Sequence, residues 1–254
     1  MPTPVVAIFG PTGVGKTAVA LALGEILKER GEDPVAISAD ALQVYRGLET
    51  LTGVATPEEQ ARLDHRMVGV VPVTEAFSVG TYMPLAHAEI DAALAAGRRP
   101  IVVGGTGLYL RAALAELSMR KVDPGAQSEL WSDATRHPTL LYGLTMDREA
   151  LYAAIERRVD ATVAAGAEAE VRAAVAAGAS RTARKALGFE ELLHGDVEAM
   201  KKRSRNYARR QLTWMRKMAG VHLIDVTGRD AADVAAEVDH MLASGREVPS
   251  APAP

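Results

Sequence analysis

The stretch "GPTGVGKTAV" (residues 10–19) follows the apolar run "PVVAIFG" (residues 4–10) and opens a segment with helical spacing of apolar residues. Gly10, Gly15, Lys16 and Thr17 complete the pattern G-x-x-x-x-G-K-[ST], between a predicted strand and a predicted helix as this motif requires. The glycines let backbone N–H groups surround a phosphate, and the helix N-terminus adds its positive end. Lys16 supplies a positive charge, and the Thr17 hydroxyl is a ligand for Mg²⁺. The stretch predicts a di- or triphosphate site with Mg²⁺, and it does not distinguish hydrolysis from group transfer.

Predicted strands alternate with predicted helices along the chain. Short apolar runs predict buried strands at 5–9, 34–40, 101–103, 140–146 and 221–226, and helices are expected at 17–30, 82–97 and, with breaks, over 147–218. This alternation predicts an α/β fold, a parallel sheet of the P-loop NTPase type flanked by helices, with a helical C-terminal part. Ligands of such sheets bind at the carboxyl ends of the strands.

Length and composition limit the remaining possibilities. A chain of 254 residues with 48% hydrophobic and 24% charged residues is typical of a soluble globular protein. We expect one domain over 1–246, a polar connection at 119–139 and a disordered tail at 247–254. A net charge of −3 gives no overall attraction to nucleic acid, and the absence of cysteine excludes disulfides and thiolate metal sites. Without an apparent leader or membrane span, we expect a cytoplasmic monomer that binds no membrane.

Two further strand ends carry residues capable of chemistry. Asp40 follows the second strand, where a carboxylate facing a phosphate loop can act as a general base. Helix capping and Mg²⁺ coordination are alternative roles for it. Thr106 lies in the turn Gly104–Gly107, whose glycines allow close backbone approach, so its hydroxyl can reach a leaving oxygen or simply cap the next helix.

The segment "KKRSRNYARRQLTWMRK" (residues 201–217) predicts a strongly basic helix. It contains eight Lys or Arg residues, and helical spacing places Arg203, Arg210 and Lys217 on one stripe. Tyr207, Gln211 and Trp214 follow a second stripe. Such a helix suits RNA backbone contact and base stacking, although a solvated basic face with its aromatic residues turned into the core is the alternative.

Taken together, several stretches resemble the tRNA dimethylallyltransferases, also called tRNA isopentenyltransferases. The phosphate loop is shared with many families, whereas the other matching stretches are specific and occur in the family's order across nearly the whole chain. They are "ISADALQVYRGLET" (37–50), "PIVVGGTGLYLRAAL" (100–114), "YGLTMDREALYAAIERRVD" (142–160), "AEVRAAVAAGASRTARKALGFEEL" (169–192) and "RNYARRQLTWMRK" (205–217).

This resemblance implies prenyl transfer from dimethylallyl diphosphate to the exocyclic amine of the adenosine that follows the tRNA anticodon. It implies that Asp40 and Thr106 are catalytic and that Thr17 and Asp40 hold Mg²⁺. The implied diphosphate-binding residues are Gly10, Thr12, Gly13, Gly15, Lys16, Thr17 and Arg172. The implied contacts to the acceptor, the anticodon loop of tRNA, are Thr12, Gln43, Tyr45, Gly105, Arg203, Arg210 and Gln211.

Three features differ from the family pattern. The inserted helical module that grips the anticodon arm is missing, and only residues 119–139 stand in its place. Ala41 replaces a serine, and Leu51–Val54 replaces a segment that carries a lysine. The missing module leaves open an adenylate isopentenyltransferase that alkylates free AMP, ADP or ATP. A P-loop small-molecule kinase and a nucleotide- or RNA-binding protein without turnover are more distant alternatives.

Overall fold

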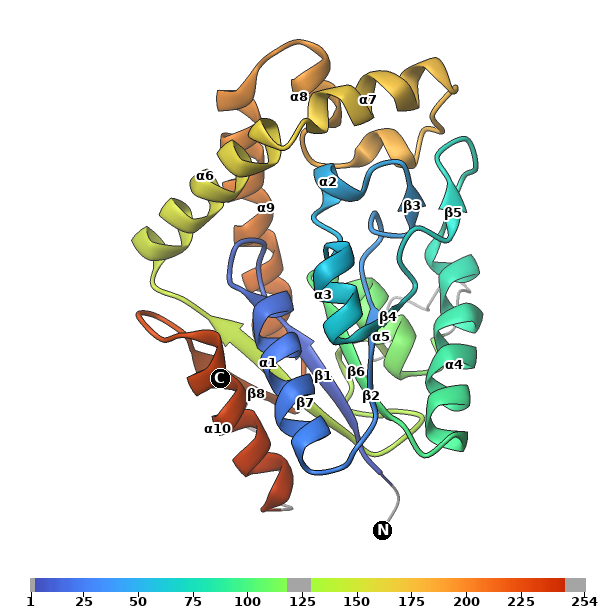
Figure 1. The fold of residues 1–254 in the computed structure, drawn as a ribbon, viewed down its shortest axis with the longest axis vertical. Coiled ribbons are helices and arrows are strands. Elements are labelled where there is room, and N and C mark those ends of the chain that lie inside the picture. The colour runs from blue at the N-terminus through green and yellow to red at the C-terminus, as the bar shows by residue number, and fades with distance from the viewer. Residues whose placement is uncertain (1–2, 118–128, 245–254) are drawn as a thin grey trace.

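A six-stranded sheet whose pairings are all parallel forms the centre of the computed structural model, which describes residues 3–117 and 129–244 (Figure 1). The strand order is β4-β2-β6-β1-β7-β8, and β3 and β5 form a separate two-stranded sheet. The strands are β1 (Val5–Phe9), β2 (Pro34–Ser38), β3 (Tyr45–Arg46), β4 (Asp64–Arg66), β5 (Val71–Pro72), β6 (Arg99–Gly104), β7 (Thr139–Thr145) and β8 (Val221–Asp225).

Helices connect these strands. They are α1 (Lys16–Glu29), α2 (Glu49–Thr52), α3 (Pro57–Arg62), α4 (Val79–Ala95), α5 (Gly107–Leu114), α6 (Arg148–Ala164), α7 (Ala167–Ala176), α8 (Phe189–Leu193), α9 (Val197–Lys217) and α10 (Ala231–Ala243). Two short 3₁₀ segments lie at Glu129–Trp131 and Ala183–Lys185. The alternation of strands and helices confirms the predicted α/β fold with a parallel sheet.

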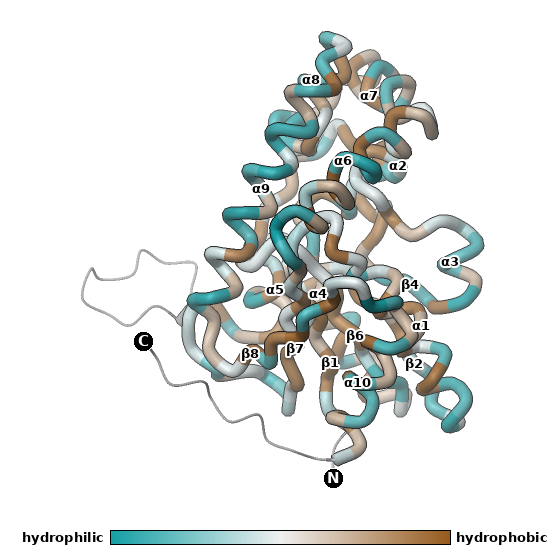
Figure 2. The backbone as a smooth tube through the Cα atoms, turned by 90° about the vertical axis from the view of Figure 1, so that its left-hand side faces the viewer, coloured by the Kyte–Doolittle hydropathy of each residue, from teal (hydrophilic) through white to brown (hydrophobic). Residues whose placement is uncertain are grey.

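The central strand β1 is buried on both faces of the sheet. Ala7 and Phe9 pack into the hydrophobic cluster that includes residues of α4 and α5. Val6 and Ile8 point to the opposite face, where their cluster includes residues of α1 and α10. Successive side chains of a strand point to opposite faces, so a continuous apolar run suits a sheet covered on both sides. Figure 2 shows the hydrophobic residues concentrated in these central strands.

A group of helices lies beyond the carboxyl edge of the sheet, above the strand ends in the view of Figure 1. It contains α2, α7 and α8, and the long helices α6 and α9 descend from it toward the sheet. Asp147 and Asp196 cap the N-termini of α6 and α9 by accepting hydrogen bonds from backbone N–H groups. The edge of the sheet that carries the predicted chemistry therefore faces two well-capped helices.

Several short elements were not predicted from the sequence. Residues 45–72 hold five of them, none longer than six residues: β3, α2, α3, β4 and β5. The longer helix α10, which follows the last strand, was also not predicted. Strands of two or three residues contain too few positions to show a two-residue periodicity. Of the polar connection predicted at 119–139, residues 119–128 lie outside the described part of the chain, as does the tail at 247–254.

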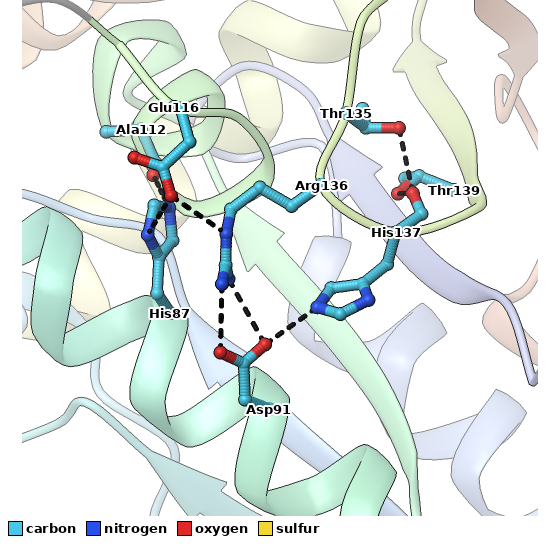
Figure 3. A network of polar contacts seen from close by, with 8 residues as sticks. All are labelled: His87, Asp91, Ala112, Glu116, Thr135, Arg136, His137 and Thr139. Carbon is cyan, nitrogen blue, oxygen red and sulfur yellow. Dashed lines mark hydrogen bonds and ion pairs between the residues drawn. The ribbon is translucent and has the colours of Figure 1, made fainter.

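Ion pairs fix the two sides of this connection to α4 (Figure 3). Arg136 pairs with Asp91 of α4 at 2.9 Å and with Glu116 at 3.1 Å. The Nε2 atom of His137 lies 2.7 Å from the same aspartate. The segments before and after residues 118–128 are thus held against one helix, on the far side of α5 from the carboxyl edge.

Candidate active site

A cavity of about 390 Å³ lies between the carboxyl edge of the sheet and helices α6 and α9. One wall consists of strand ends and the loops that follow them, and the other consists of helix side chains. The strand wall includes Thr12, Gly13, Gly15, Lys16, Thr17, Asp40, Gln43, Gly104 and Gly105. The helical wall includes Ile155, Arg158, Val159, Met200, Ser204, Tyr207 and Gln211. Three strand ends predicted to carry chemistry therefore meet at a single cavity.

The phosphate loop depends on its glycines. Gly13 and Gly15 have φ angles of 84° and 95°, in the left-handed region that favours glycine. A Cβ atom at Gly13 would lie 2.8 Å from Cγ1 of Ile155, and one at Gly10 would lie 3.0 Å from the carbonyl oxygen of Leu144. The loop can therefore pass close to α6 and β7 only without these side chains.

Lys16 lies across the loop that precedes it. Its Nζ donates to the carbonyl oxygens of Gly10 at 3.0 Å and Pro11 at 2.9 Å. Burial, reinforced by the guanidinium of Arg158, lowers the pKa of Lys16 to about 8, and Asp40 opposes this shift. A bound anion would favour the charged form of this lysine.

Asp40 lines the cavity, and Thr106 lies beside it. The Oδ1 atom of Asp40 accepts a hydrogen bond from the backbone N–H of Leu42 at 2.9 Å. The Thr106 hydroxyl donates to Oδ2 of Asp40 at a long 3.4 Å. Thr106 occupies the N-cap position of α5, yet its side chain makes no capping hydrogen bond. Its hydroxyl is thus directed toward Asp40 and not toward the helix.

Arg158 is a cation of this site that the sequence analysis missed. It extends from α6, donates to Oγ1 of Thr12 and to the carbonyl oxygen of Thr52, and lies buried near Lys16 and Asp40. A Cβ atom at Gly53 would lie 2.4 Å from Nη2 of Arg158, so glycine makes room for the guanidinium. Helical spacing could have indicated that Arg158 faces the protein, because Leu151, Ile155 and Val159 form the buried face of α6 and residue 158 lies beside it.

Burial lowers the pKa of Arg158, and the nearby Asp40 opposes that effect. A buried guanidinium with a planar set of donors suits a phosphate or diphosphate group. Lys16 and Arg158 therefore give the cavity two positive charges close to one carboxylate.

Arg172, predicted to bind diphosphate, lies away from the cavity in this structure. Arg172 lies on α7 with an exposed side chain that pairs with Glu168 at 2.6 Å, one helical turn away. It is absent from the wall of the cavity. Its position in a run of alternating small and charged residues gave no sign of which face it occupies, and Arg158 is the arginine that the fold brings to the phosphate loop.

Gln43 and Tyr45 follow Asp40 closely but have different surroundings. Gln43 lines the cavity, where its Nε2 donates to the carbonyl oxygen of Gly53 at 2.9 Å and its Oε1 accepts from the Ser38 hydroxyl at 2.7 Å. Tyr45 is fully buried, and its hydroxyl lies 2.6 Å from Oγ1 of Thr182. Tyr45 is therefore part of the core in this structure and does not line the cavity, and its predicted substrate contact stays a prediction.

Tyr207 and Gln211 turn inward from α9, one helical turn apart. The Tyr207 hydroxyl lies 3.1 Å from Oγ1 of Thr106. The Gln211 amide accepts from the backbone N–H of Thr12 at 2.8 Å and donates to the carbonyl oxygen of Gly105 at 2.7 Å. Gln211 is almost completely buried and connects the phosphate loop to the Gly105 turn, and it also lines the cavity, so the contact to the acceptor stays a prediction.

The third residue of that stripe, Trp214, also packs inside the protein. It contacts Trp131 at 4.7 Å between ring centroids and lies over Gly107, where a Cβ atom would be 2.5 Å from Cε3 of the indole. The predicted alternative, in which the aromatic residues of the basic helix turn into the core, describes Trp214, whereas Tyr207 faces the cavity. These rings do not form an exposed platform for stacking bases.

The cations of α9 divide between ion pairs and solvent. Arg203 pairs with Glu191 of α8 at 2.8 Å and is partly buried by that contact. Arg210 is exposed, with its guanidinium 5.4 Å from the centre of the Tyr207 ring. Much of α9 is coloured as hydrophilic in Figure 2. Its exposed cations are Lys202, Arg209, Arg210, Arg216 and Lys217.

Neither a metal cage nor a membrane span is found in the described part of the chain. Residues 3–117 and 129–244 contain no group of three or more His, Cys, Asp or Glu residues arranged for a metal ion. None of the helices there is both long and apolar enough to cross a lipid bilayer.

The parallel sheet, the glycine-dependent loop and its lysine define an α/β protein of the P-loop class. The family model described as IPP transferase matches residues 43–137 and 126–218, and the model described as isopentenyl transferase matches residues 3–74. The chain belongs to the IPP transferase family.

Relatives with known names extend this assignment. The chain is similar to the tRNA dimethylallyltransferases of Symbiobacterium thermophilum, at 32% identity, and Geobacillus kaustophilus, at 33%, over 93% of this chain and 94% of each relative. The tRNA isopentenylpyrophosphate transferase from Bacillus halodurans superposes with a TM-score of 0.80 at 28% identity, over 95% of this chain and 96% of that one. A eukaryotic dimethylallyltransferase acting on tRNA has the same fold, with a TM-score of 0.81 at 20% identity, over 99% of this chain and 82% of that one.

Proposed function

We propose that this protein transfers a dimethylallyl group from dimethylallyl diphosphate to the exocyclic amine of the adenosine that follows the tRNA anticodon. The observation that carries this proposal is the meeting of Lys16, Arg158 and Asp40 at one cavity of a chain that belongs to the IPP transferase family. Two cations suit the diphosphate, and the carboxylate suits an amine that must lose a proton.

In this reaction the amine nitrogen forms a bond to the allylic carbon, and the bond from that carbon to the diphosphate oxygen breaks. The electron pair of the broken bond leaves with the diphosphate. The phosphate loop, Lys16 and Arg158 stabilise the charge that develops there. Asp40 takes the proton that the amine releases, and the Thr106 hydroxyl lies beside Asp40 to position it or the leaving oxygen.

The residues of the cavity fit a Mg²⁺ ion held together with the diphosphate. Mg²⁺ in enzymes is commonly bound by one or two protein oxygens plus phosphates and water, so the absence of a carboxylate cage among the described residues is compatible with it. Thr17 and Asp40, both on the cavity wall, would hold the ion. When bound, it would neutralise charge on the diphosphate.

We further propose that the exposed cations of α9 contact the tRNA backbone, since they lie on the helix whose inner face reaches the cavity. The target base would have to leave its stack to reach the cavity. Arg210 is adjacent to Gln211 in the sequence and its guanidinium lies 5.4 Å from the centre of the Tyr207 ring, and within the described residues it has no ion pair of the kind that engages Arg203.

The short connection at 119–139 favours a second candidate function, prenylation of free AMP, ADP or ATP. The alignment with the first relative runs over 304 residues, more than the 254 of this chain, so part of that relative has no counterpart here. The two segments of the IPP transferase match overlap at residues 126–137, which supports a gap at this connection. Without the module expected there, the anticodon arm has fewer contacts.

A transfer assay separates the two functions. Purified protein is incubated with labelled dimethylallyl diphosphate and Mg²⁺, and the acceptor is either unmodified tRNA that reads codons beginning with U or free AMP. Label in tRNA is the expected result, and label only in AMP would establish the second function. The Asp40→Asn protein, assayed in parallel, shows that any transfer belongs to this site. ATP consumption against a small alcohol with no prenyl transfer would overturn both.

A further inference from the structure

The inward face of α9 places a tyrosine hydroxyl on the pair of residues proposed to be catalytic. Tyr207 lies on the cavity wall, with its hydroxyl 3.1 Å from Oγ1 of Thr106. Thr106 in turn donates to Oδ2 of Asp40. The three side chains form a linear series that runs from a helix of the helical wall to two strand ends of the sheet.

The direction of the hydrogen bonds in this series follows from proton count. A threonine hydroxyl has one proton, and Thr106 donates it to the carboxylate of Asp40. The contact to Tyr207 must then use a lone pair of Thr106, with the phenol as donor. Burial, reinforced by Asp40, raises the pKa of Tyr207 to about 12, so the phenol keeps its proton throughout the range in which enzymes work.

Nothing else in the described structure fixes the Thr106 hydroxyl. Its side chain makes no capping bond to α5, and its contact to Asp40 is long. A threonine hydroxyl rotates freely about its C–O bond unless a donor and an acceptor both engage it. We propose that Tyr207 is a positioning residue that holds the Thr106 hydroxyl toward Asp40 and the reacting centre.

Two neighbours of Tyr207 on α9 help to fix its position. The Arg210 guanidinium lies over its ring, and the next inward residue, Gln211, is bonded to the phosphate loop and to Gly105. The position of the phenol relative to Thr106 therefore depends on the position of α9. This role rests on the proposed prenyl transfer, because it concerns the same Asp40–Thr106 pair.

The test compares single-turnover rates of dimethylallyl transfer for wild type, Tyr207→Phe, Thr106→Val and the double variant. Tyr207→Phe keeps the ring under Arg210 and removes only the hydroxyl. We expect a rate about tenfold lower, equivalent to one hydrogen bond, with KM for dimethylallyl diphosphate unchanged. In the Thr106→Val background, Tyr207→Phe should have no further effect, because Tyr207 acts through the Thr106 hydroxyl.

Thr106→Ser gives a second background in which the hydroxyl is retained. Tyr207→Phe should lower the rate there at least as much as in wild type, because the smaller serine side chain has more rotamers to restrict. Tyr142→Phe is the matched control, since the buried Tyr142 hydroxyl has no hydrogen-bond partner among the described residues and lies outside the cavity. Its transfer rate should equal that of wild type.

Three results would overturn the inference. The first is a Tyr207→Phe protein as fast as wild type. The second is a double variant whose loss of rate equals the product of the losses of Tyr207→Phe and Thr106→Val. The third is a loss that appears only as a higher KM. All three presuppose a wild type that transfers prenyl groups. A wild type that transfers none would instead refute the proposed function itself, so the two failures are distinguishable.

Discussion

The two walls of the cavity are built in different ways. The strand wall takes Lys16 and Asp40 from segments that follow buried strands, and a third such segment carries Thr106, which contacts Asp40. The helical wall takes Arg158, Tyr207 and Gln211 from helices that lie later in the chain. The strand wall carries the groups that can perform chemistry, whereas the helical wall supplies charge and alignment. This difference predicts that substitutions on the strand wall abolish turnover, and that those on the helical wall weaken binding or slow the reaction.

The largest effect is expected at Asp40. Asp40→Asn removes the proton acceptor while keeping the side-chain size, and we expect turnover to fall by roughly 10³-fold, within the range for general bases. Diphosphate binding, measured by calorimetry in the presence of Mg²⁺, should persist. If Asp40→Asn instead abolished diphosphate binding, Asp40 would act chiefly as a Mg²⁺ ligand.

Arg158 offers the sharpest contrast between predictions from sequence and from structure. Arg158→Met should weaken diphosphate binding by about 10- to 100-fold, because a charged hydrogen bond contributes about 1.5–3 kcal/mol. Arg172→Met is the matched control, since that exposed arginine pairs only with Glu168 in the described structure and should bind diphosphate as wild type does. The reverse pattern, measured by the same titrations, would show that the original prediction for Arg172 was right.

The lowered pKa of Lys16 predicts an alkaline limit to binding. In the free protein this lysine loses its charge as the pH rises through about 8, so diphosphate affinity should be full below that value and decrease above it. Affinity measured from pH 6.5 to 9.5 should fall by up to tenfold per pH unit above the pKa. Lys16→Arg should remove this decrease in affinity, because arginine keeps its charge throughout this range. An alkaline decrease in affinity that persists in the Lys16→Arg protein would show that another group titrates there.

The strand wall was largely predictable from the sequence. The phosphate loop is one continuous motif, and Asp40 and Thr106 each follow an apolar run that could only be a buried strand. Carboxyl ends of parallel strands meet at one edge of a sheet, so their convergence followed from the fold class. The missed elements at 45–72 are too short to show a periodicity.

The helical wall was not predictable to the same degree. The basic composition of residues 201–217 suggested an RNA surface, whereas three of its residues, Tyr207, Gln211 and Trp214, contact the catalytic loops and the core. Helical spacing groups these residues on one face but does not say what that face meets. The partners are set by long-range packing, which also decides between Arg158 and Arg172.

Gln211 links the two walls of the cavity, so its substitution should lower the stability of the protein. Gln211→Leu leaves the backbone N–H of Thr12 and the carbonyl of Gly105 unpaired, which costs about 1–3 kcal/mol. For a chain of this size, the melting temperature should decrease by about 2–4 °C per kcal/mol. Gln60→Leu, which removes one hydrogen bond to the carbonyl oxygen of Ala55 and leaves the phosphate loop and the Gly105 turn untouched, should have a smaller effect. Equal melting temperatures for the two variants would argue against the bridge.

The smallest effect is expected far from the cavity, at the ion pairs of Figure 3. The hydrogen bond from Arg136, aided by that from His137, lowers the pKa of Asp91 below its usual value near 3.8. Its stabilising contribution is therefore present at neutral pH and is lost as the pH falls below about 4. Because Asp91 is partly exposed, Asp91→Asn should cost less than about 1 kcal/mol at pH 7 in urea unfolding, with transfer activity unchanged. A loss of activity would show that this network communicates with the cavity.

The most direct test of the proposed chemistry is the stoichiometry of the products. The protein is given dimethylallyl diphosphate, Mg²⁺ and unmodified tRNA, and released diphosphate is counted against prenylated adenosine in the digested tRNA. A cavity in which Lys16 and Arg158 hold a leaving group predicts one diphosphate per prenylated adenosine, with no nucleoside triphosphate required. Dependence on a triphosphate, or a phosphoryl group on the acceptor, would contradict it.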